Sequence, residues 1–346
     1  MPDAHKNGYQ PLPITIEGFN DALLDVACPD DLEPIPVNTL YVGYPMGDCA
    51  GVVRSVMALE QMVEEHGPGV HCYHEIVHNG WVRRIFEDMG VVFVNSPEEV
   101  PEGSPIMLSA HGTAPDVKKT FISLGGPVVD SVCPLVRKVH SEVERRSKDN
   151  GKIIYIGHPG TDEVEGVRGF NDDIHIVDSV ERVRILMESG VISEEDKVSV
   201  LMQTTLAESD WGPIDAEVSA YWPTAWRPAN EDICYATTNR QKAANMLVDK
   251  GVDAILVVTA PNSSNGKSLV RVVRDRGIPA YPVQYASDIP QEVEGLNIGL
   301  TASASSPPEL IIGQIMARLS PISMELVFAT AETEHFDLPA ALRQKH

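Results

Sequence analysis

Short apolar runs alternate with amphipathic stretches of helical period from about residue 38 to residue 320. The runs at residues 153–156 and 254–258 are continuously apolar, which is typical of strands that are buried on both faces. Parallel strands need a long crossover, and the amphipathic stretches between the runs supply it as helices. The pattern therefore predicts an α/β fold built from mostly parallel sheets.

Polar residues follow almost every expected strand. The strands are expected at residues 40–43, 105–108, 128–129, 153–156, 198–201, 254–258 and 298–300. Most of them lead into loops that carry His, Cys, Ser, Thr or Asn. In open parallel sheets, ligands bind beyond the carboxyl ends of the strands. We therefore expect these loops to form a binding site.

Three of the five cysteines, Cys49, Cys133 and Cys234, stand at the start of an expected helix. They are 84 and 101 residues apart, which predicts three similar α/β units with one cysteine each. The expected boundaries are an N-terminal extension at 1–37, units at 38–132, 133–230 and 231–320, and a C-terminal tail at 321–346. Cys28 and Cys72 lie outside this pattern and are expected to be structural.

The position of the three cysteines favours metal binding. A helix N-terminus stabilises a thiolate and lowers the pKa of its thiol, and the thiolate is the form that binds metals. A single cysteine at such a place is more often a small buried apolar side chain, but three at equivalent junctions favour a metal centre. Zinc with a histidine as fourth ligand and an iron–sulfur cluster with one iron lacking a protein ligand both remain open.

The segment from His74 to His78 reads His-Glu-Ile-Val-His. In a helix, this spacing places two imidazoles on one face, as in zinc proteases, so a metalloprotease is one alternative. The β-branched residues Ile76 and Val77 follow a strand-like run and disfavour a helix here.

Further polar loops suit a phosphorylated ligand and proton transfer. His111 follows an expected strand, where it is either a ligand-binding residue or an ordinary loop histidine. Residues 263–265, Ser-Ser-Asn, lie between a strand and a helix and could hold a phosphate. Glu163 belongs either to a solvated helix start or, in a pocket shielded from water, to proton transfer.

The charge and the cysteine content exclude several classes of protein. The formal net charge is −23, so the chain would repel the phosphate backbone of a nucleic acid. We find no apolar run of the roughly 20 residues that a membrane helix needs. Five cysteines in 346 residues do not suggest a secreted disulfide scaffold, and the acidic first segment does not read as a targeting signal. We therefore expect a cytoplasmic protein.

Eight ordered motifs between about Leu40 and Ser320 together resemble one known family. They begin at Cys49 (CAGV), His74 (HEIVHN), Ser109 (SAHG), Cys133 (CPLVRKVH), Gln203 (QTTL), Asp232 (DICYATTNRQ), Asn262 (NSSN) and Thr301 (TASAS). The chain resembles the 4-hydroxy-3-methylbut-2-enyl diphosphate reductases, the last enzymes of the non-mevalonate isoprenoid pathway.

The resemblance implies a three-lobed α/β assembly around a central [4Fe-4S] cluster held by the three cysteines named above. It implies a reductive dehydroxylation that yields isopentenyl and dimethylallyl diphosphate. Glu163 and Thr204 would lie near the allylic hydroxyl, with Glu163 as the proton source. The residues that would bind the diphosphate substrate are His78, His111, Ser263, Ser264, Asn265 and Ser305, and Thr161 stands at a further position that contacts substrate in the family.

Some residues depart from the family pattern. Thr161 replaces a histidine and carries no cationic form, and Asp48 stands where the family commonly has Phe. Lys267 and Ser268 replace the usual Asn-Arg, and Ser303 replaces a usual Gly. Two alternatives therefore stay open: a divergent paralogue with the same cluster and a different allylic substrate, and a non-catalytic redox sensor based on the cluster.

The chain shows no flavin or nicotinamide motif, so its electrons must come from a small carrier such as a ferredoxin or a flavodoxin. These carriers are generally acidic, and so is this chain. We therefore expect a local basic patch near the cluster to dock the carrier. The candidates follow the cluster cysteines and are Arg137, Lys138, Arg240 and Lys242.

Overall fold

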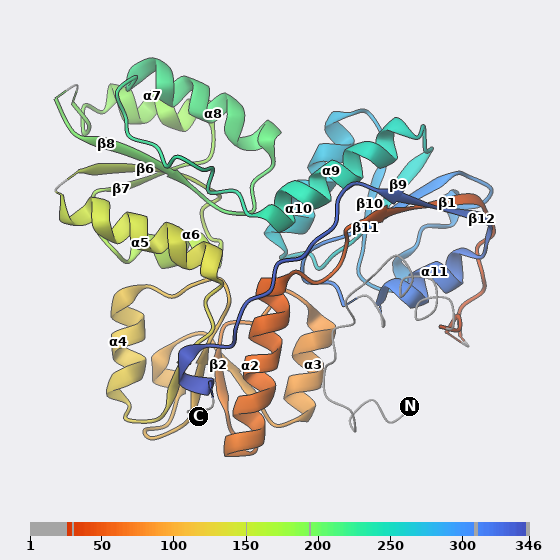
Figure 1. The fold of residues 1–346 in the computed structure, drawn as a ribbon, viewed down its shortest axis with the longest axis horizontal. Helices are drawn as coiled ribbons and strands as arrows, with labels where there is room; N and C mark the ends of the chain where they lie inside the picture. Colours follow the sequence, from red (N-terminus) through yellow and green to blue (C-terminus); the bar gives the residue numbers. More distant parts are fainter. Residues whose placement is uncertain (1–25, 30, 150, 194, 308–310, 344–346) are drawn as a thin grey trace. The chain divides into compact units, whose positions relative to one another are not determined.

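The computed structural model describes residues 26–343, apart from 30, 150, 194 and 308–310 (Figure 1). The described chain divides into two compact units. Unit 1 comprises the described residues up to Val53, His78–Gly80 and Tyr235–His335. Unit 2 comprises Arg54–Val77, Trp81–Cys234 and the described residues from Phe336 onward. Most of the expected N-terminal extension lies outside the described residues.

Unit 1 contains one five-stranded parallel sheet with the order β10-β9-β11-β1-β12. Its strands are β1 (Val37–Tyr44), β9 (Ala254–Val258), β10 (Ala280–Val283), β11 (Ile298–Ala302) and β12 (Pro321–Phe328). Its helices are α9 (Tyr235–Asp249), α10 (Ser264–Asp275) and α11 (Gly313–Leu319). All five residues of β9 are buried, because α9 and α10 pack their apolar residues against the sheet.

Unit 2 contains a four-stranded parallel sheet with the order β3-β2-β4-β5. Its strands are β2 (His71–Tyr73), β3 (Val92–Val94), β4 (Ile106–Leu108) and β5 (Val128–Asp130). The associated helices are α2 (Ala50–His66), α3 (Gly80–Asp88) and α4 (Pro115–Ser123), and the first residues of α2 and α3 belong to unit 1. Cys72 is fully buried in β2, as expected for a structural cysteine.

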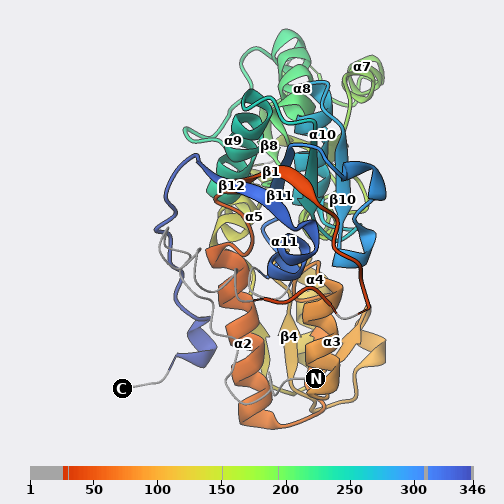
Figure 2. The ribbon, with the colours of Figure 1, turned by 90° about the vertical axis from the view of Figure 1, so that its right-hand side faces the viewer.

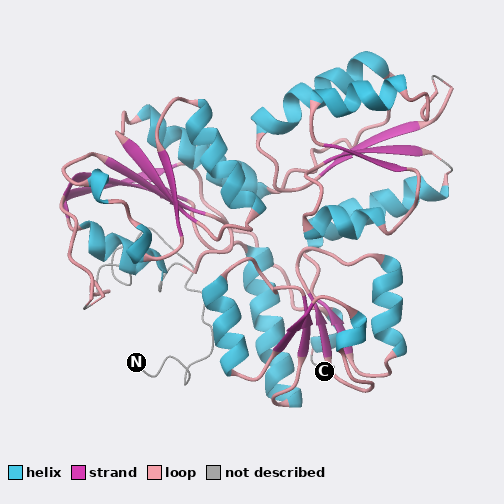
Figure 3. Ribbon diagram, turned by 180° about the vertical axis from the view of Figure 1, so that it is seen from behind, coloured by secondary structure: helices cyan, strands magenta, loops and turns pink. Residues whose placement is uncertain are grey.

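A three-stranded parallel sheet, β7-β6-β8, completes unit 2. Its strands are β6 (Lys152–Ile156), β7 (Ile174–Val177) and β8 (Val198–Met202). Its helices are α5 (Pro134–Lys148), α6 (Asp162–Arg168), α7 (Val180–Glu188) and α8 (Glu208–Tyr221). Helices α5 and α6 cover one face of this sheet and α7 and α8 cover the other (Figure 3). Within the described residues, short 3-10 helices form at Pro97–Glu99, Ala286–Asp288, Gln291–Val293 and Ala340–Leu342.

Three parallel sheets confirm the α/β class, but the sheets do not follow the expected boundaries. Strand β1 lies between β11 and β12 in the sheet of unit 1 (Figure 2), whereas the sequence groups it with residues 38–132. Residues 321–328 form β12, whereas the sequence places them in a tail. Both strands are placed by pairing with distant residues, which local periodicity does not report. None of the described helices is both long and apolar enough to span a membrane.

Candidate active site

Each predicted cysteine lies at the start of a helix. Cys49 directly precedes α2, Cys133 caps α5, and Cys234 directly precedes α9. Each cysteine also lies in a loop that follows a strand or is hydrogen-bonded to such a loop. Cys49 follows β1, Cys133 follows β5, and the Cys234 N–H donates to the carbonyl of Thr204, which follows β8, at 3.0 Å. Each of the three sheets therefore has one of these cysteines at or beside its loops, but the sheets are not the three sequence units to which the cysteines were assigned.

Cys133 and Cys234 lie close enough in unit 2 for their charges to interact. Burial, together with a smaller effect of negative charge on Cys234, raises the pKa of the Cys133 thiol to about 11. The backbone N–H groups of Leu135 and Val136, at the start of α5, act in the opposite direction. The predicted lowering of this pKa is therefore wrong for the thiol by itself, because the loss of solvation outweighs the helix N-terminus.

Glu163 and Thr204 lie in direct contact in unit 2. Helix α6 carries Glu163, and Thr204 follows β8. The Thr204 N–H donates to Oε1 of Glu163 at 2.8 Å, and the Thr204 hydroxyl donates to Oε2 at 3.0 Å. Both residues are buried, and burial raises the pKa of Glu163 to about 7 despite these hydrogen bonds. A carboxyl group with this pKa can both hold and release a proton near neutral pH.

The loop that carries His111 is tied to the Cys133 loop. The Cys133 N–H donates to the carbonyl of Ala110 at 3.0 Å. Gly112 follows with φ +93°, and a Cβ atom there would lie 2.4 Å from the His140 ring. Only glycine suits this position, because it tolerates both the positive φ and the close approach. His111 therefore directly follows Ala110, the residue whose carbonyl accepts the hydrogen bond from Cys133.

Thr161 is the residue before α6, the helix that carries Glu163. Its hydroxyl donates to the carbonyl of His158 at 2.9 Å. The carboxylate of the next residue, Asp162, contacts the imidazole of His74, with 2.7 Å between Oδ1 of Asp162 and Nδ1 of His74. The hydroxyl of Thr161 is therefore engaged with backbone at the start of the helix.

The structure contradicts the helical zinc motif. Residues 74–78 form bends rather than a helix, and His74 has a positive φ of 59°. The spacing of His74 and His78 therefore does not bring two imidazoles to one helix face, which removes the argument for a metalloprotease.

Cys49 lies beside the expected phosphate-binding residues of unit 1. The Cys49 N–H donates to the carbonyl of Ala304 at 3.2 Å. The Ala304 N–H in turn donates to the side-chain oxygen of Asn265 at 2.9 Å, and Asn265 donates to the Thr237 hydroxyl at 3.2 Å. The loop after β11 and the start of α10 are thereby fixed next to the cysteine.

The remaining predicted residues of unit 1 form a second set of contacts. The Ser305 hydroxyl donates to the carbonyl of His78 at 3.1 Å, and the His78 ring lies 3.2 Å from the side-chain nitrogen of Asn262. Ser263 caps α10 by accepting from the Gly266 N–H at 3.2 Å, and Ser264 is the first residue of that helix. Hydroxyl, amide and imidazole groups therefore gather around a helix N-terminus, an arrangement that suits an anion.

Sequence reasoning missed two arginines that support the cysteine loops. Arg240 is fully buried and donates to the Gly47 carbonyl at 3.1 and 2.6 Å, two residues before Cys49. The expectation that Arg240 helps to dock an electron carrier is therefore wrong, since its charge does not reach the surface. Arg54 is also buried and donates to the Ser131 carbonyl at 2.7 Å, two residues before Cys133. No local pattern distinguishes such residues from surface arginines.

The donor set fits a thiolate-bound metal centre. Cys133 and Cys234 are half-buried, and none of the described cysteines forms a disulfide. A negative charge on one of these thiols disfavours ionisation of the other. A metal cation that binds both would stabilise the two thiolates. Among the described residues of unit 2 they are accompanied by buried Glu163 and Thr204.

These features define a thiol-bearing α/β protein with parallel sheets, a buried acid and a helix start whose polar groups suit an anion. Residues 40–320 match the family model described as "LytB protein". The chain therefore belongs to the LytB family.

Curated relatives support this assignment. The chain is 37% identical over 315 residues to the 4-hydroxy-3-methylbut-2-enyl diphosphate reductase of Methylibium petroleiphilum, covering 89% of this chain and 94% of the relative. It is 40% identical over 309 residues to the enzyme of that name from Zymomonas mobilis, covering 88% and 89%. The family resemblance of the sequence motifs is thus confirmed.

A solved structure agrees as well. The E-1-hydroxy-2-methyl-but-2-enyl-4-diphosphate reductase of Plasmodium falciparum superposes with a TM-score of 0.83 and 30% identity, covering 89% of this chain and 97% of that one. A solved structure of (E)-4-hydroxy-3-methyl-but-2-enyl diphosphate reductase, described as the terminal enzyme of the non-mevalonate pathway, gives a TM-score of 0.57 and 25% identity, covering 82% and 99%.

Proposed function

We propose that this chain catalyses the reductive dehydroxylation of 4-hydroxy-3-methylbut-2-enyl diphosphate to isopentenyl and dimethylallyl diphosphate. The curated relatives of this family carry the name of that activity. The observation that carries the proposal is the buried pair of Glu163 and Thr204, since a redox sensor needs no proton donor of this kind. The reaction takes up two electrons from the carrier and two protons: one proton leaves with the hydroxyl group as water, and the other is added to the allylic carbon skeleton. Glu163, with its pKa of about 7, is the proton source and is reprotonated from solvent between the two transfers.

The diphosphate group binds, in this proposal, to His78, His111, Ser263, Ser264, Asn265 and Ser305. Support comes from unit 1, where Ser263 caps α10 and Asn265 is buried beside the loop after β11. A helix N-terminus and neutral hydroxyl donors stabilise phosphate oxygens without the repulsion that this acidic chain would otherwise impose.

Cys49, Cys133 and Cys234 hold a [4Fe-4S] cluster in this proposal. When bound, such a cluster supplies electrons and an open iron that acts as a Lewis acid toward a hydroxyl oxygen. The half-buried thiols of unit 2 and the N–H groups at the start of α5 suit thiolate ligands. Thr204 orients the Glu163 carboxyl group, and burial of that pair excludes water from the proton.

The test combines spectroscopy with turnover on anaerobically purified protein. Mössbauer spectra are recorded with and without 4-hydroxy-3-methylbut-2-enyl diphosphate. A four-iron cluster with one distinct iron that responds to this compound supports the proposal. A cluster without any response indicates a paralogue with another substrate or a sensor, and zinc or no metal overturns the redox mechanism.

The matched variants are Glu163→Gln and Glu165→Gln, which lie on the same helix. Glu163→Gln removes the proton and should lower kcat by about 10²–10⁴-fold. Glu165 is about half exposed, with 49% of its side chain accessible, so Glu165→Gln should leave kcat unchanged. Equal rates for both variants would remove Glu163 from the reaction.

Thr161 is proposed to contact the substrate where the family has a histidine. A Thr161→His variant restores a potential imidazolium, and a charge-assisted hydrogen bond contributes about 1.5–3 kcal/mol. We expect KM to fall by about ten-fold or more. A variant with unchanged KM and kcat would show that position 161 lies outside the pocket.

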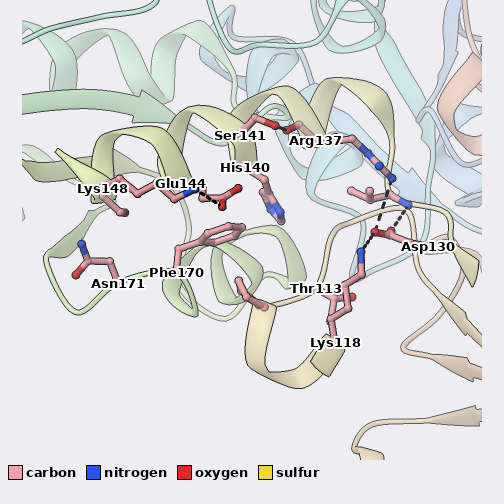
Figure 4. A pocket seen from close by; sticks show the side chains of 13 residues that line it. Thr113, Lys118, Asp130, Arg137, His140, Ser141, Glu144, Lys148, Phe170 and Asn171 are labelled. Atoms are coloured by element: carbon pink, nitrogen blue, oxygen red, sulfur yellow. Dashed lines mark hydrogen bonds and ion pairs between the residues drawn. The ribbon is translucent and has the colours of Figure 1, made fainter. Parts of the chain in front are cut away.

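The electron donor is proposed to be a small acidic carrier, a ferredoxin or a flavodoxin, that docks on unit 2 near Cys133. Arg137 and Lys138 are exposed on the first turns of α5. Arg137 faces a cavity of about 670 Å³ that Lys118 and Lys148 also line, together with their ion-pair partners Asp130 and Glu144 (Figure 4). Charge complementarity mainly raises the association rate, which falls as salt rises.

Reversing both charges with Arg137→Glu and Lys138→Glu should therefore slow carrier-driven turnover and flatten its salt dependence. Turnover driven by a small chemical reductant should be unchanged. Arg182→Glu combined with Lys197→Glu, two exposed cations of unit 2, changes the net charge by the same amount and is the control. Unchanged carrier kinetics in the double variant would contradict this docking surface.

The cytoplasm is the proposed compartment, because the chain depends on reduced thiols. None of the described cysteines forms a disulfide, including the three that would bind the cluster. Thiols of this kind are maintained in a reducing compartment.

A further inference from the structure

Tyr155 is a fully buried tyrosine in β6. Its ring packs in a core cluster with Val139, Val164 and Leu201, so the side chain contributes mainly apolar contacts. A phenol hydroxyl in such a core needs a hydrogen-bond partner. The hydroxyl of Tyr155 lies 3.4 Å from Oε1 of Glu163, to which it donates.

The two oxygens of Glu163 therefore have different surroundings. Oε1 accepts from the Thr204 N–H at 2.8 Å and from the Tyr155 hydroxyl at 3.4 Å. Oε2 faces only the Thr204 hydroxyl, at 3.0 Å, among its partners in the described chain. A backbone N–H is a donor only, whereas a threonine hydroxyl both donates and accepts.

A proton on Oε2 satisfies more of these groups than a proton on Oε1. On Oε1 it would compete with two donors, and one of them, the Thr204 N–H, cannot turn to accept a hydrogen bond. On Oε2 it would point at the Thr204 hydroxyl, which can turn to accept it. Oε1 then keeps both of its donors as a carbonyl oxygen.

We propose that Tyr155 is a positioning residue that keeps Oε1 of Glu163 as an acceptor and so places the exchangeable proton on Oε2, beside the Thr204 hydroxyl. The inference rests on the proposed role of Glu163 as proton donor. Tyr155 itself touches no reacting atom and acts only through Glu163.

The titratable groups around Glu163 come from three further segments. They are Tyr155 from β6, Asp232 from the segment before Cys234, and Cys133 at the start of α5. Burial raises the pKa of Tyr155 well above its usual value, so the phenol stays protonated and remains a donor. Asp232 also raises the pKa of Glu163, whereas the Tyr155 hydroxyl lowers it. Tyr155 is the neighbouring titratable side chain that donates to the carboxyl group.

Infrared spectroscopy of the holoenzyme tests the assignment directly. The C=O stretch of protonated Glu163 is identified as the band that Glu163→Gln abolishes. In Tyr155→Phe the carbonyl oxygen loses one donor, so this band should shift to higher frequency. Site-specific 3-fluorotyrosine at position 155 is a stronger donor of nearly the same shape, and it should shift the band to lower frequency.

Kinetics supply the second measurement. Loss of one hydrogen bond that orients the proton should lower kcat by about ten-fold in Tyr155→Phe, with KM unchanged. The basic limb of the pH profile should move to higher pH, because a donor that favours the carboxylate is gone. Tyr281→Phe, in β10 of unit 1, is the control and should change none of these quantities.

The outcomes separate this proposal from the proposed function. If Glu163→Gln is inactive while the band and kcat of Tyr155→Phe stay unchanged, the role of Tyr155 is overturned and that of Glu163 stands. If Glu163→Gln keeps full activity, the proton-donor role itself fails. If Tyr155→Phe does not fold, the 3-fluorotyrosine protein decides, and an unshifted band there overturns the assignment.

Discussion

Two buried arginines support the loops before two of the cysteines, and they are compensated differently. In unit 1, Arg240 donates to the Gly47 carbonyl and pairs with Glu332, with 2.9 Å between Nη1 and Oε1. In unit 2, Arg54 donates to the backbone carbonyls of Ser131 and Asp337, at 2.7 and 2.8 Å. The loops are held by the same kind of hydrogen bond, but only Arg240 has a carboxylate partner within the recorded contacts.

The pKa values of the two arginines shift in opposite directions as a consequence of this difference. Burial opposes the charge on Arg240, but Glu332 and then Cys49 outweigh it and raise the pKa. Burial lowers the pKa of Arg54, and the neighbouring Arg137 lowers it further. At the Cys49 loop, the buried charge of Arg240 is therefore compensated by the Glu332 carboxylate. At the Cys133 loop, the nearby Asp130 carboxylate favours the charge on Arg54 but does not outweigh burial.

The largest expected effect is the loss of Arg240. Arg240→Met leaves the Glu332 carboxylate without its partner and the Gly47 carbonyl without its donor. The free energy of unfolding should fall by about 3–5 kcal/mol, measured by denaturant titration. Lys242→Met, exposed on the same helix, should have almost no effect.

A second variant decides whether charge is the cause. Replacing both partners, Arg240→Met with Glu332→Met, removes the uncompensated carboxylate and should recover a large part of the lost stability. If the double variant were as unstable as Arg240→Met, the carbonyl contacts rather than the ion pair would dominate.

A smaller loss is expected at Arg54. Arg54→Met removes a donor from the Asp337 carbonyl and leaves the Ser131 carbonyl with the Ser55 hydroxyl, and it leaves no buried carboxylate unpaired, so the free energy of unfolding should fall by about 1–3 kcal/mol. Arg54→Lys should restore part of it. A loss equal to that of Arg240→Met would show that the carboxylate does not distinguish the two loops.

The smallest expected effect concerns Asp130, one of the charges near Arg54. Burial opposes ionisation, but Lys118 and the Val132 N–H outweigh it and hold the pKa of Asp130 below its usual value. A lowered pKa stabilises the fold above the unfolded value of about 3.9, and this contribution is lost as the pH falls through the folded value.

Lys118→Met should therefore cost at most about 1 kcal/mol at neutral pH, because the pair is partly exposed, with 39% and 23% of the side chains accessible. The difference from the unmodified protein should vanish under acid conditions in which Asp130 is protonated. Lys119→Met, which removes an exposed pair with Asp116, is the control. A difference that is independent of pH would assign the effect to packing.

Local pattern predicted much of this fold. The expected strands at residues 153–156, 198–201 and 254–258 coincide with β6, β8 and β9 to within one residue. Cys49, Cys133 and Cys234 begin helices as predicted, because a helix start has local signals such as Pro134. Sheet membership was not predictable in the same way. Leu40 pairs with Ile298 and Met324, and no short window contains that information.

The same distinction between local signals and tertiary contacts applies to the candidate site. Family motifs identified Glu163 and Thr204, and the structure brings them into contact. Arg240 was misread as a surface cation because it follows Cys234, a predicted cluster ligand, although burial and Glu332 give it a structural role. Nothing in the sequence marks Tyr155 as a functional residue, since a tyrosine in a buried strand is ordinarily a core residue.

The sequence by itself determined the α/β class, the helix-start cysteines and the family, because these depend on periodicity, local capping and ordered motifs. Tertiary structure decided which strands form each sheet, which arginines are buried, and which carboxyl oxygen faces which donor. These features depend on pairing between distant segments and on loss of solvation, and both exist only once the chain has packed.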